Sequence, residues 1–277
     1  MNSSPPPFNA ASVLRQHGLR PDKSLGQNFL QDPSALEKII RAAEVEPDDT
    51  VLEIGPGLGS LTRYLATCAK TVTAIELDHN LIPVLQTVLA PYANVRIIEG
   101  DILKFPPAEL VGARLDDYLV VANVPYYITS AIFRHLLAKP PRPRRIVLTI
   151  QKEVAERICA RPGELSLLAL SIQVYGQPGI AATIPAEAFY PAPKVDSAVI
   201  RVDLYPDPII SSNLLDRFFR LAKAGFSQKR KTLRNSLSAG LGISTGAAAQ
   251  ILEQAGIDPQ RRAETLSLEE WGKLSNQ

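Results

Sequence analysis

Four consecutive residues near the middle of the chain, Asn123-Val124-Pro125-Tyr126, carry groups that could activate an amine. The side-chain carbonyl of Asn123 and the main-chain carbonyl of Val124 or Pro125 can accept both hydrogens of a ring-conjugated amine. Such an amine is a poor nucleophile, and two acceptors would localise its lone pair and stabilise the cation that forms as it attacks a methyl group. Tyr126 offers a face on which a base can stack, and Pro125 stiffens the turn without a competing N–H. These residues predict methyl transfer to an exocyclic adenine amine, whereas an ordinary strand-ending turn would leave their order unexplained.

A glycine-rich segment, LEIGPGLGSLT at 52–62, follows a short apolar run. Gly55 and Gly57 let the backbone turn tightly and approach a ligand closely. The dinucleotide fingerprint requires glycine or alanine where this chain has Ser60, and Glu53 would lie poorly beside a pyrophosphate. A cationic sulfonium ligand with an amino-acid tail suits that carboxylate better. A glycine turn that binds nothing is the simpler alternative.

Two further acids follow the next predicted strands. Glu76 lies about 20 residues beyond the glycine turn, where an acid accepts hydrogen bonds from the ribose hydroxyls of an adenosine-containing cofactor. Asp101, in EGDIL, is placed to accept from the adenine amine. Helix capping is the alternative for both acids, and Asp78 is a better cap candidate than Glu76. Acids at three successive strand ends predict S-adenosylmethionine as the cofactor, with a nicotinamide nucleotide as the weaker choice.

The elements that must position these residues alternate along the chain. Short apolar runs, expected to be strands, occur at 50–54, 71–77, 94–100, 117–124 and 145–151, and amphipathic helical patterns occur at 60–69 and 81–89. This alternation predicts a mostly parallel sheet covered on both faces, with ligands bound at the carboxyl ends of its strands. Two later runs, at 167–176 and 196–205, have no helix between them and are expected to form an antiparallel closing pair. We therefore predict a Rossmann-like, seven-stranded methyltransferase domain of the α/β class.

The C-terminal part of the chain has a different pattern. After the linker PDP at 206–208 no strand-like run follows, and helical patterns occupy 211–225, 229–238, 245–255 and 267–274. The last helix has a capping box, Ser267 with Glu270. We predict three parts: a flexible, proline-containing leader at 1–22, an S-adenosylmethionine-binding domain at 23–205, and a small all-helical RNA-binding domain at 206–277.

Basic residues are concentrated in two stretches that contain no acid. The stretch 217–234 carries Arg217, Arg220, Lys223, Lys229, Arg230, Lys231 and Arg234, and the second stretch is RHLLAKPPRPRR at 134–145. Either stretch alone could be a solvated surface. Together, with aromatic residues between them, they favour a surface that binds a nucleic-acid backbone, although the net charge of +2 indicates nothing by itself.

Several separate segments agree in order with one known family. With NVPY and EIGPGLG, the segments KSLGQNFLQDP (23–33), QKEVAERI (151–158), AFYPAPKVDSAVIRV (188–202) and FSQKRKTLRNSL (226–237) resemble the ribosomal RNA adenine dimethyltransferases of the KsgA type. The resemblance extends from about Lys23 to the C-terminal helices. Val124 departs from it, because the family commonly has leucine there, but the main-chain carbonyl is unaffected.

The resemblance implies roles for individual residues. Asn28 and Leu30 would cover the methionine side of the cofactor, and Gly55 would lie along its amino-acid tail. The ribose would be held by Glu76, the adenine by Asp101, and the methyl group would lie near Asn123. Phe189 would stack on the target base opposite Tyr126. The same segments also have plainer interpretations, as a loop before a helix capped by Asp32 and as a proline-stiffened loop.

The implied substrate is a pair of adjacent adenosines in a hairpin loop near the 3′ end of small-subunit (16S) ribosomal RNA, each dimethylated at N6 during small-subunit biogenesis. Loop bases can be splayed into a pocket at modest cost. The expected partner is the immature small subunit, and the C-terminal helices would hold its RNA. Scattered histidines and an apolar run too short for a bilayer lead us to expect no metal and no membrane partner. We expect a cytoplasmic monomer, although no residue pattern bears on the oligomeric state.

Three alternatives remain open. A large-subunit ribosomal RNA adenine methylase of the macrolide-resistance type shares the catalytic turn, but the tail RRAETLSLEEW resembles the small-subunit type better. Methylases of DNA adenine or of a protein glutamine usually have a second proline or an aspartate in the turn. A ribosome-assembly or transcription factor could keep the fold and lose turnover, although the intact Asn123, Tyr126, Glu76 and Asp101 argue against this.

Overall fold

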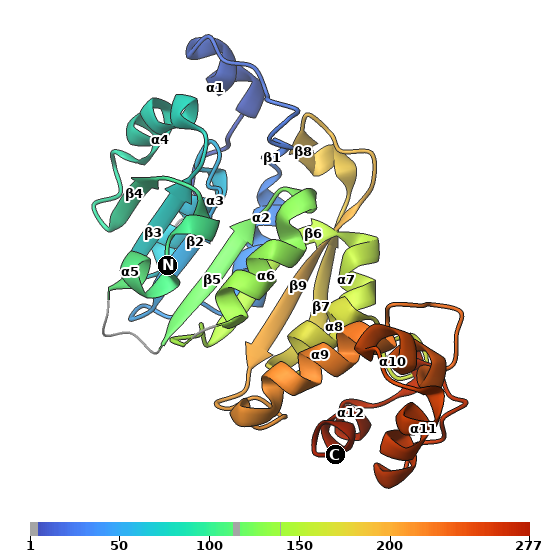
Figure 1. Cartoon of the computed structure of the whole chain (residues 1–277). Coiled ribbons are helices and arrows are strands. Elements are labelled where there is room, and N and C mark those ends of the chain that lie inside the picture. The colour runs from blue at the N-terminus through green and yellow to red at the C-terminus, as the bar shows by residue number, and fades with distance from the viewer. Residues whose placement is uncertain (1–4, 113–116, 139) are drawn as a thin grey trace. The chain divides into compact units, whose positions relative to one another are not determined.

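The computed structural model of the chain describes residues 5–112, 117–138 and 140–277 (Figure 1). Contacts divide the chain into two compact units: residues 1–155 with 179–204, and residues 156–178 with 205–277. The first unit contains an α/β domain, and the second is mainly helical. The boundaries that the sequence predicted for leader, catalytic domain and helical domain stay predictions.

The α/β unit is built on one seven-stranded sheet (Figure 1). The spatial order of its strands is β4 (Val95–Glu99), β3 (Thr71–Glu76), β2 (Thr50–Ile54), β5 (Tyr118–Asn123), β6 (Arg145–Gln151), β9 (Ser197–Leu204) and β7 (Gly176–Ile184). The strands β2 to β6 pair in parallel, and β9 runs antiparallel to β6. The predicted strands up to residue 151 are confirmed, because their Val- and Ile-rich runs are buried on both faces of the sheet, with β4 only partly buried.

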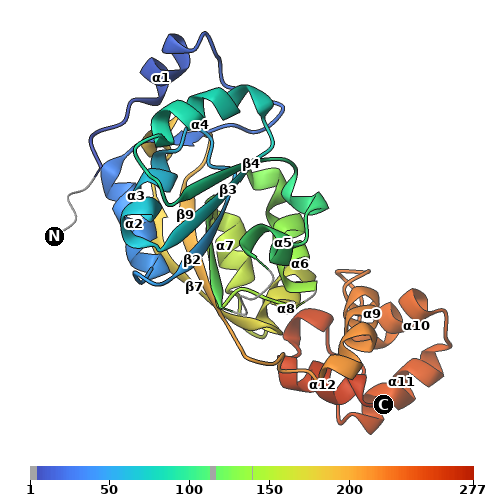
Figure 2. The same ribbon diagram turned by 90° about the vertical axis from the view of Figure 1, so that its left-hand side faces the viewer.

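Helices cover both faces of the sheet, as Figure 1 and Figure 2 show together. The helices of this part of the chain are α1 (Ala10–Gln16), α2 (Pro33–Ala43), α3 (Ser60–Cys68), α4 (Ile82–Leu89), α5 (Pro107–Val111), α6 (Thr129–Ala138) and α7 (Lys152–Ile158). The helices α2 and α3 lie on one face and α6 on the other. A core cluster joins Leu36 and Ile39 of α2 and Leu65 of α3 to Val121 and Val147 of the sheet.

The expectation for residues 167–176 was wrong. Residues Leu167–Gln173 form helix α8, capped by Ser166, whose hydroxyl accepts a hydrogen bond from the N–H of Ala169. A short run that is apolar on all sides does not distinguish a buried helix from a buried strand. The strand β7 follows in GQPGIAATI, and it was not predicted because glycine and proline are uncommon inside strands. Proline is tolerated there because β7 is the edge strand of the sheet.

The N-terminal segment is packed, which differs from the expectation of a flexible leader. Asn9 caps helix α1, whose Ala10 and Leu14 are buried in a cluster with Phe29 and Leu58. The two-residue strand β1 (Phe29–Leu30) pairs antiparallel with β8 (Phe189–Tyr190), so two distant segments of the chain lie side by side. The apolar residues of the leader were sufficient for this packing but too few to indicate it.

The second unit contains α8, α9 (Leu215–Gly225), α10 (Leu233–Leu241), α11 (Thr245–Gln254) and α12 (Leu268–Ser275). The capping box predicted for the last helix is confirmed, since the Ser267 and Glu270 side chains each accept the other's main-chain N–H. Trp271 of α12 is buried, with its ring 6.5 Å from Phe218 and 6.0 Å from Phe226 between centroids. Helix α10 approaches α9 closely at Gly240, where an added Cβ would meet Ala224 at 2.6 Å.

The remaining elements are short 3-10 turns at His79–Leu81, Ile102–Lys104, Tyr126–Ile128, Ala186–Ala188, Ser212–Leu214 and Ala263–Thr265. Within the described parts of the chain, none of the helices has the length and apolarity needed to cross a membrane.

Candidate active site

The glycine turn after β2 is tied to the end of β3 by one carboxylate. Gly55 and Gly57 both have positive φ, at 67° and 60°. A Cβ on Gly57 would meet the Phe29 ring at 3.0 Å, so space and backbone both require glycine there. The N–H of Gly57 donates to Glu76 Oε2 (3.0 Å) and the N–H of Asp78 donates to Oε1 (2.9 Å). Burial raises the pKa of Glu76, and these N–H bonds lower it without cancelling the effect of burial.

The N-terminal segment closes one side of the same turn. The Ser60 hydroxyl donates to the Leu30 carbonyl oxygen at 2.5 Å, so the residue that departs from the dinucleotide fingerprint holds β1 in place. The Gln27 amide donates to Asp78 Oδ2 at 2.7 Å. Asp78 also caps the turn that begins at His79, as expected. The segment before α2 is thus fixed against the ends of β2 and β3.

Glu53 lies in the interior behind the glycine turn. Its side chain is only 1% exposed, and its Oε2 accepts no hydrogen bond from any described residue. Burial raises the pKa of Glu53 to about 8, and the neighbouring charge of Glu76 adds to the rise. The nearby Thr62 hydroxyl lowers the pKa, yet it has no hydrogen bond of normal geometry among the described residues. A buried carboxylate of this kind is costly unless a cation reaches it.

The amide of Asn123 is oriented by a main-chain carbonyl. Its Nδ2 donates to the Asn28 carbonyl oxygen at 3.2 Å, which leaves the side-chain oxygen as the free acceptor. Of the two main-chain candidates beside it, the Pro125 carbonyl accepts the N–H of Ile128 at 3.2 Å. Among the described residues nothing donates to the Val124 carbonyl, so it is the better second acceptor.

Two aromatic side chains of the site differ in their environment. The Tyr126 ring is half-buried, and its hydroxyl is 2.8 Å from the hydroxyl of the fully buried Ser197 at the start of β9. Burial raises the pKa of Tyr126. Phe189 is only 4% exposed and belongs to the core cluster that contains Leu30, its register partner. Phe189 also lines the cavity described next, and its stacking role stays a prediction.

One cavity of about 1040 Å³, part of it open to solvent, joins these residues at the carboxyl ends of the strands. All the residues predicted for cofactor binding and catalysis line it: Asn28, Leu30, Gly55, Gly57, Glu76, Asp101, Asn123, Val124, Pro125, Tyr126 and Phe189. Asp101 both lines the cavity and caps the turn at Ile102, so its capping role does not conflict with a role in binding. Gln27, Tyr127 and Leu77 also line the cavity and were not predicted from the sequence; the position of Tyr127 beside Tyr126 was the available signal for one of them.

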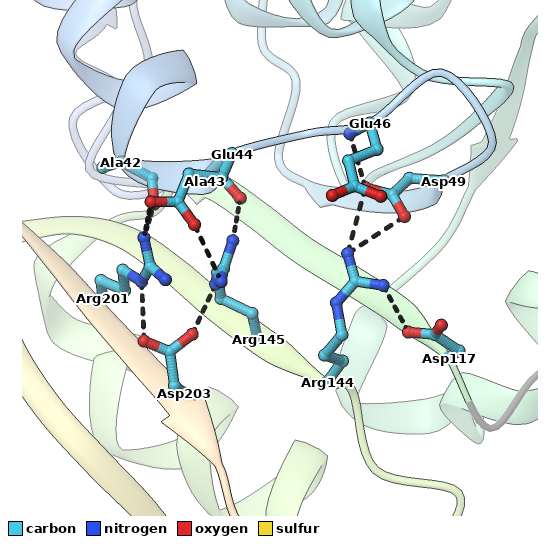
Figure 3. Close-up of polar contacts among 10 residues, drawn as sticks. All are labelled: Ala42, Ala43, Glu44, Glu46, Asp49, Asp117, Arg144, Arg145, Arg201 and Asp203. Carbon is cyan, nitrogen blue, oxygen red and sulfur yellow. Dashed lines mark hydrogen bonds and ion pairs between the residues drawn. The ribbon is translucent and has the colours of Figure 1, made fainter.

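Charged residues at the opposite, amino-terminal edge of the sheet are paired with one another (Figure 3). Arg144 bonds Asp49 at 3.1 Å and Asp117 at 2.6 Å. Arg145 and Arg201 share two acids, Asp203 and Glu44, at distances between 2.6 and 3.1 Å. The Arg201 hydrogen bond lowers the pKa of Glu44. Burial raises the pKa of Asp203, but the bonds from Arg201 and Arg145 outweigh it and leave the pKa below its ordinary value.

This edge corrects the interpretation of the basic stretch 134–145. Two of its arginines, Arg144 and Arg145, are held by acids, so their charges are balanced within the fold. Position 139 lies outside the described residues.

The seven basic residues predicted to bind RNA lie in the second unit. Arg217, Arg220 and Lys223 are on α9, Arg234 is on α10, and Lys229 to Lys231 are in the loop between them. Five are exposed, and Arg217 and Arg234 are half-buried. In the described part of the chain, none of the seven forms an ion pair with an acid.

The sheet order, the glycine turn and the strand-end acids around one cavity define a Rossmann-like methyltransferase that uses S-adenosylmethionine. The lining fits this cofactor, since it offers carboxylates to a cation and hydrogen-bonding partners to an adenosine, with no basic side chain among its described residues. Glycine at position 55 leaves open space where a Cβ would lie.

Comparison with known proteins narrows this class. Residues 18–277 match the family model described as ribosomal RNA adenine dimethylase. The chain is 46% identical over 265 residues to ribosomal RNA small subunit methyltransferase A of Dehalococcoides mccartyi strain 195, covering 96% of this chain and 91% of the relative. It is 44% identical to the protein of the same name in Moorella thermoacetica, covering 99% and 98%.

Two solved structures are similar over most of the chain. A dimethyladenosine transferase from Plasmodium falciparum has a TM-score of 0.74 and 28% identity, covering 89% of this chain and 95% of its own. The 23S ribosomal RNA methyltransferase ErmE has a TM-score of 0.70 and 28% identity, covering 90% and 98%. The chain belongs to the ribosomal RNA adenine dimethylase family. It is an S-adenosylmethionine-dependent enzyme that dimethylates adenine in ribosomal RNA.

Proposed function

We propose that the enzyme acts on two adjacent adenosines in a hairpin loop near the 3′ end of small-subunit ribosomal RNA and makes each an N6,N6-dimethyladenosine. The observation that carries this is identity of 41–46% to proteins named small subunit methyltransferase A over 96–99% of the chain. The similarity to ErmE, which is named as a methyltransferase of 23S ribosomal RNA, is lower at 28%. We further propose that the immature small subunit is the partner, in the cytoplasm, and that the enzyme acts as a monomer.

We propose that different residues of the cavity bind different parts of the cofactor. Asn28, Leu30, Gly55 and Gly57 hold the methionine part of the cofactor. Glu76 holds the ribose, and Asp101 holds the adenine. S-adenosylmethionine supplies an electrophilic methyl group on a sulfonium centre.

Catalysis is assigned to the oxygen of the Asn123 side chain and the Val124 carbonyl. Both accept hydrogens of the target amine, so its lone pair is directed at the methyl group and the new cation is stabilised. The cation is acidic enough to release its proton to water, so no strong base is needed. Tyr126 stacks on the splayed base, a contact worth roughly 1–3 kcal/mol, and Phe189 closes the other side.

The substrate is tested with purified protein and labelled cofactor. Undermethylated small subunits, large-subunit ribosomal RNA and duplex DNA are each incubated with the enzyme, digested, and analysed for labelled nucleosides. Dimethyladenosine from small subunits alone is the expected result. Label in large-subunit RNA alone would identify the substrate as that of the ErmE-like rival, and no incorporation anywhere would favour an assembly factor without turnover.

We propose that the second unit, including the helices after residue 205, holds the RNA backbone through its seven unpaired basic residues. Neutralising Lys229, Arg230 and Lys231 should weaken RNA binding and flatten the dependence of log K on log salt by about 0.7–0.9 for each phosphate that the variant no longer neutralises. Lys70, exposed just before β3 at the amino edge of the sheet, is the control, and Lys70→Gln should leave the slope unchanged. An unchanged slope in the triple variant would place the RNA surface elsewhere.

A further inference from the structure

The cavity contains acids without a compensating base. Three carboxylic acids line it, Glu53, Glu76 and Asp101, and no Lys, Arg or His is among the described lining residues. The exposed side chain of Lys104, which does not line the cavity, has its Nζ 4.0 Å from Asp101 Oδ2. Like charges held together in a region of low dielectric disfavour full ionisation, so this cavity cannot carry three negative charges without cost.

The three acids are not equivalent. Both oxygens of Glu76 accept main-chain N–H groups, and Asp101 Oδ1 accepts the N–H of Leu103 while its Oδ2 faces Lys104. Glu53 has neither kind of support, since it is 1% exposed with an unpartnered Oε2. Burial and the charge of Glu76 raise the pKa of Glu53 to about 8. With a pKa of about 8, the carboxyl of Glu53 is predominantly protonated at neutral pH.

Among the described residues, no basic side chain forms an ion pair with Glu53, and the groups around its carboxyl explain why. Glu76 acts on it from β3 with a like charge, and Thr62 acts from α3 with a neutral hydroxyl. Beyond Glu76 lies a further acid, Asp78, whose main-chain N–H donates to Glu76 Oε1 and whose Oδ2 accepts from the Gln27 amide. The next residue of α3, Arg63, is buried but directed away, with its guanidinium donating to the Pro6 carbonyl and lying over the Phe8 ring.

We propose that Glu53 holds a proton in the free enzyme and that binding of the positively charged cofactor expels this proton to solvent. S-adenosylmethionine carries a sulfonium, an ammonium and a carboxylate, so it brings one net positive charge into the cavity and can replace the proton. The carboxyl loses H⁺ to the buffer, and no covalent bond of the cofactor changes. The inference rests on the assignment of this cavity to the cofactor.

One consequence is that cofactor uptake is linked to pH. Below a pH of about 8, binding must also remove the proton, so the Kd for S-adenosylmethionine falls by up to tenfold for each unit that the pH rises toward that value. Above it, Glu53 is already ionised and the linkage disappears.

Isothermal titration calorimetry of the purified full chain tests this directly. At pH 7, S-adenosylmethionine is titrated in buffers of different ionisation enthalpy, and the slope of binding enthalpy against ionisation enthalpy gives the number of protons released. The cofactor's own α-amino group titrates at a pKa of about 8, so the quantity that decides is the difference between wild type and Glu53→Gln. The expected difference is about 0.9 proton released per cofactor bound. Equal proton release by the two proteins would overturn the proposal.

Two measurements keep the test decisive if Glu53→Gln does not fold. Infrared difference spectra of the wild type should lose a carboxylic-acid C=O stretch when the cofactor binds; no such loss would contradict the inference. The wild-type Kd should fall steeply between pH about 6 and about 7.5, and a flat profile would also contradict it. Failure of the proposed function is distinguishable, because the RNA substrate is identified from the labelled nucleosides, whereas proton release and the Kd are measured with the cofactor alone.

Discussion

The two edges of the central sheet hold charge in opposite ways. At the amino-terminal edge, Arg144, Arg145 and Arg201 each meet acids, and the shared carboxyls of Asp203 and Glu44 have lowered pKa values (Figure 3). At the carboxyl edge, no basic residue is among the described residues that line the cavity with Glu53, Glu76 and Asp101, and the pKa values of Glu53 and Glu76 are raised. The first arrangement stabilises the free fold, whereas the second is costly until a ligand completes it. The ion pairs at one end of the strands can thus offset the destabilisation that the buried acids cause at the other end.

The largest expected effect is on the rate of methyl transfer at the carboxyl edge. Asn123→Ala should slow methyl transfer by roughly 10²-fold or more, because it removes one of two oriented acceptors for the target amine. Single-turnover assays measure the loss, and titration with the cofactor should show a Kd close to that of the wild type. Unchanged turnover would remove Asn123 from the proposed chemistry.

The second prediction concerns stability and the sign of its pH dependence. The raised pKa of Glu53 means that the folded state holds a proton that the unfolded chain releases, so the free energy of unfolding falls as the pH rises from about 4.5 to about 8. Glu53→Gln removes this dependence and should be more stable than the wild type by an amount that grows across that window to about 4–5 kcal/mol at its upper end, since each pKa unit of the shift corresponds to about 1.36 kcal/mol. Calorimetric melting of both proteins without cofactor measures it. A constant difference in Tm across the window would show that Glu53 does not titrate there.

The amino edge should behave in the opposite way. Arg201→Gln is expected to lower the free energy of unfolding by about 1–2 kcal/mol at neutral pH, because it removes one of the two arginines that pair with the partly exposed acids Glu44 and Asp203 and leaves only Arg145. The acids have lowered pKa values, so this loss should be present above their ordinary pKa values, near 4, and should diminish as acid protonates them. Methyl-transfer rates of the folded variant should match the wild type.

A matched control exists in the exposed pair Lys273–Glu269, at 2.9 Å on one face of α12. Lys273→Gln should leave the free energy of unfolding close to that of the wild type, because both side chains of the pair are exposed. Equal losses in the free energy of unfolding for Lys273→Gln and Arg201→Gln would mean that the ion-pair network at the amino edge stabilises the fold no more than an exposed ion pair does.

The smallest expected effect concerns the orientation of Tyr126. Ser197→Ala should reduce kcat/KM for RNA by about threefold to tenfold, since one hydrogen bond that fixes the ring is worth roughly 1 kcal/mol. The effect should vanish in a Tyr126→Phe background, where the phenol hydroxyl is already absent. Cofactor affinity should be the same in all four proteins. An undiminished effect in the double variant would show that Ser197 supports the sheet and not the tyrosine.

The carboxyl edge could be predicted from sequence, because parallel topology alone brings strand ends together. Once the Val- and Ile-rich runs were identified as strands, Glu53, Glu76, Asp101 and Asn123 had to lie at one edge of one sheet. The amino edge could not be predicted in this way. Arg201 lies 159 residues from Ala42, whose carbonyl it bonds, and no local pattern indicates such a pairing.

The same reason explains the remaining errors. Tyr126 and Ser197 are separated by 71 residues, so their hydrogen bond depends on the final register of β9 against β6. The strand β7 lacked apolar alternation because an edge strand buries little, and the run that became α8 was apolar on all sides. The sequence predicted structure best where the interacting residues are close in the chain, as in the capping box of Ser267 and Glu270.

Trp271 is the only tryptophan of the chain, and it is enclosed in the helical unit beside Phe218 and Phe226. Intrinsic fluorescence excited at the indole therefore reports the unfolding of that unit alone, whereas far-ultraviolet circular dichroism reports helices throughout the chain. Denaturant titrations followed by both signals would show, without any label, whether the helices of the second unit lose their structure before the methyltransferase sheet does.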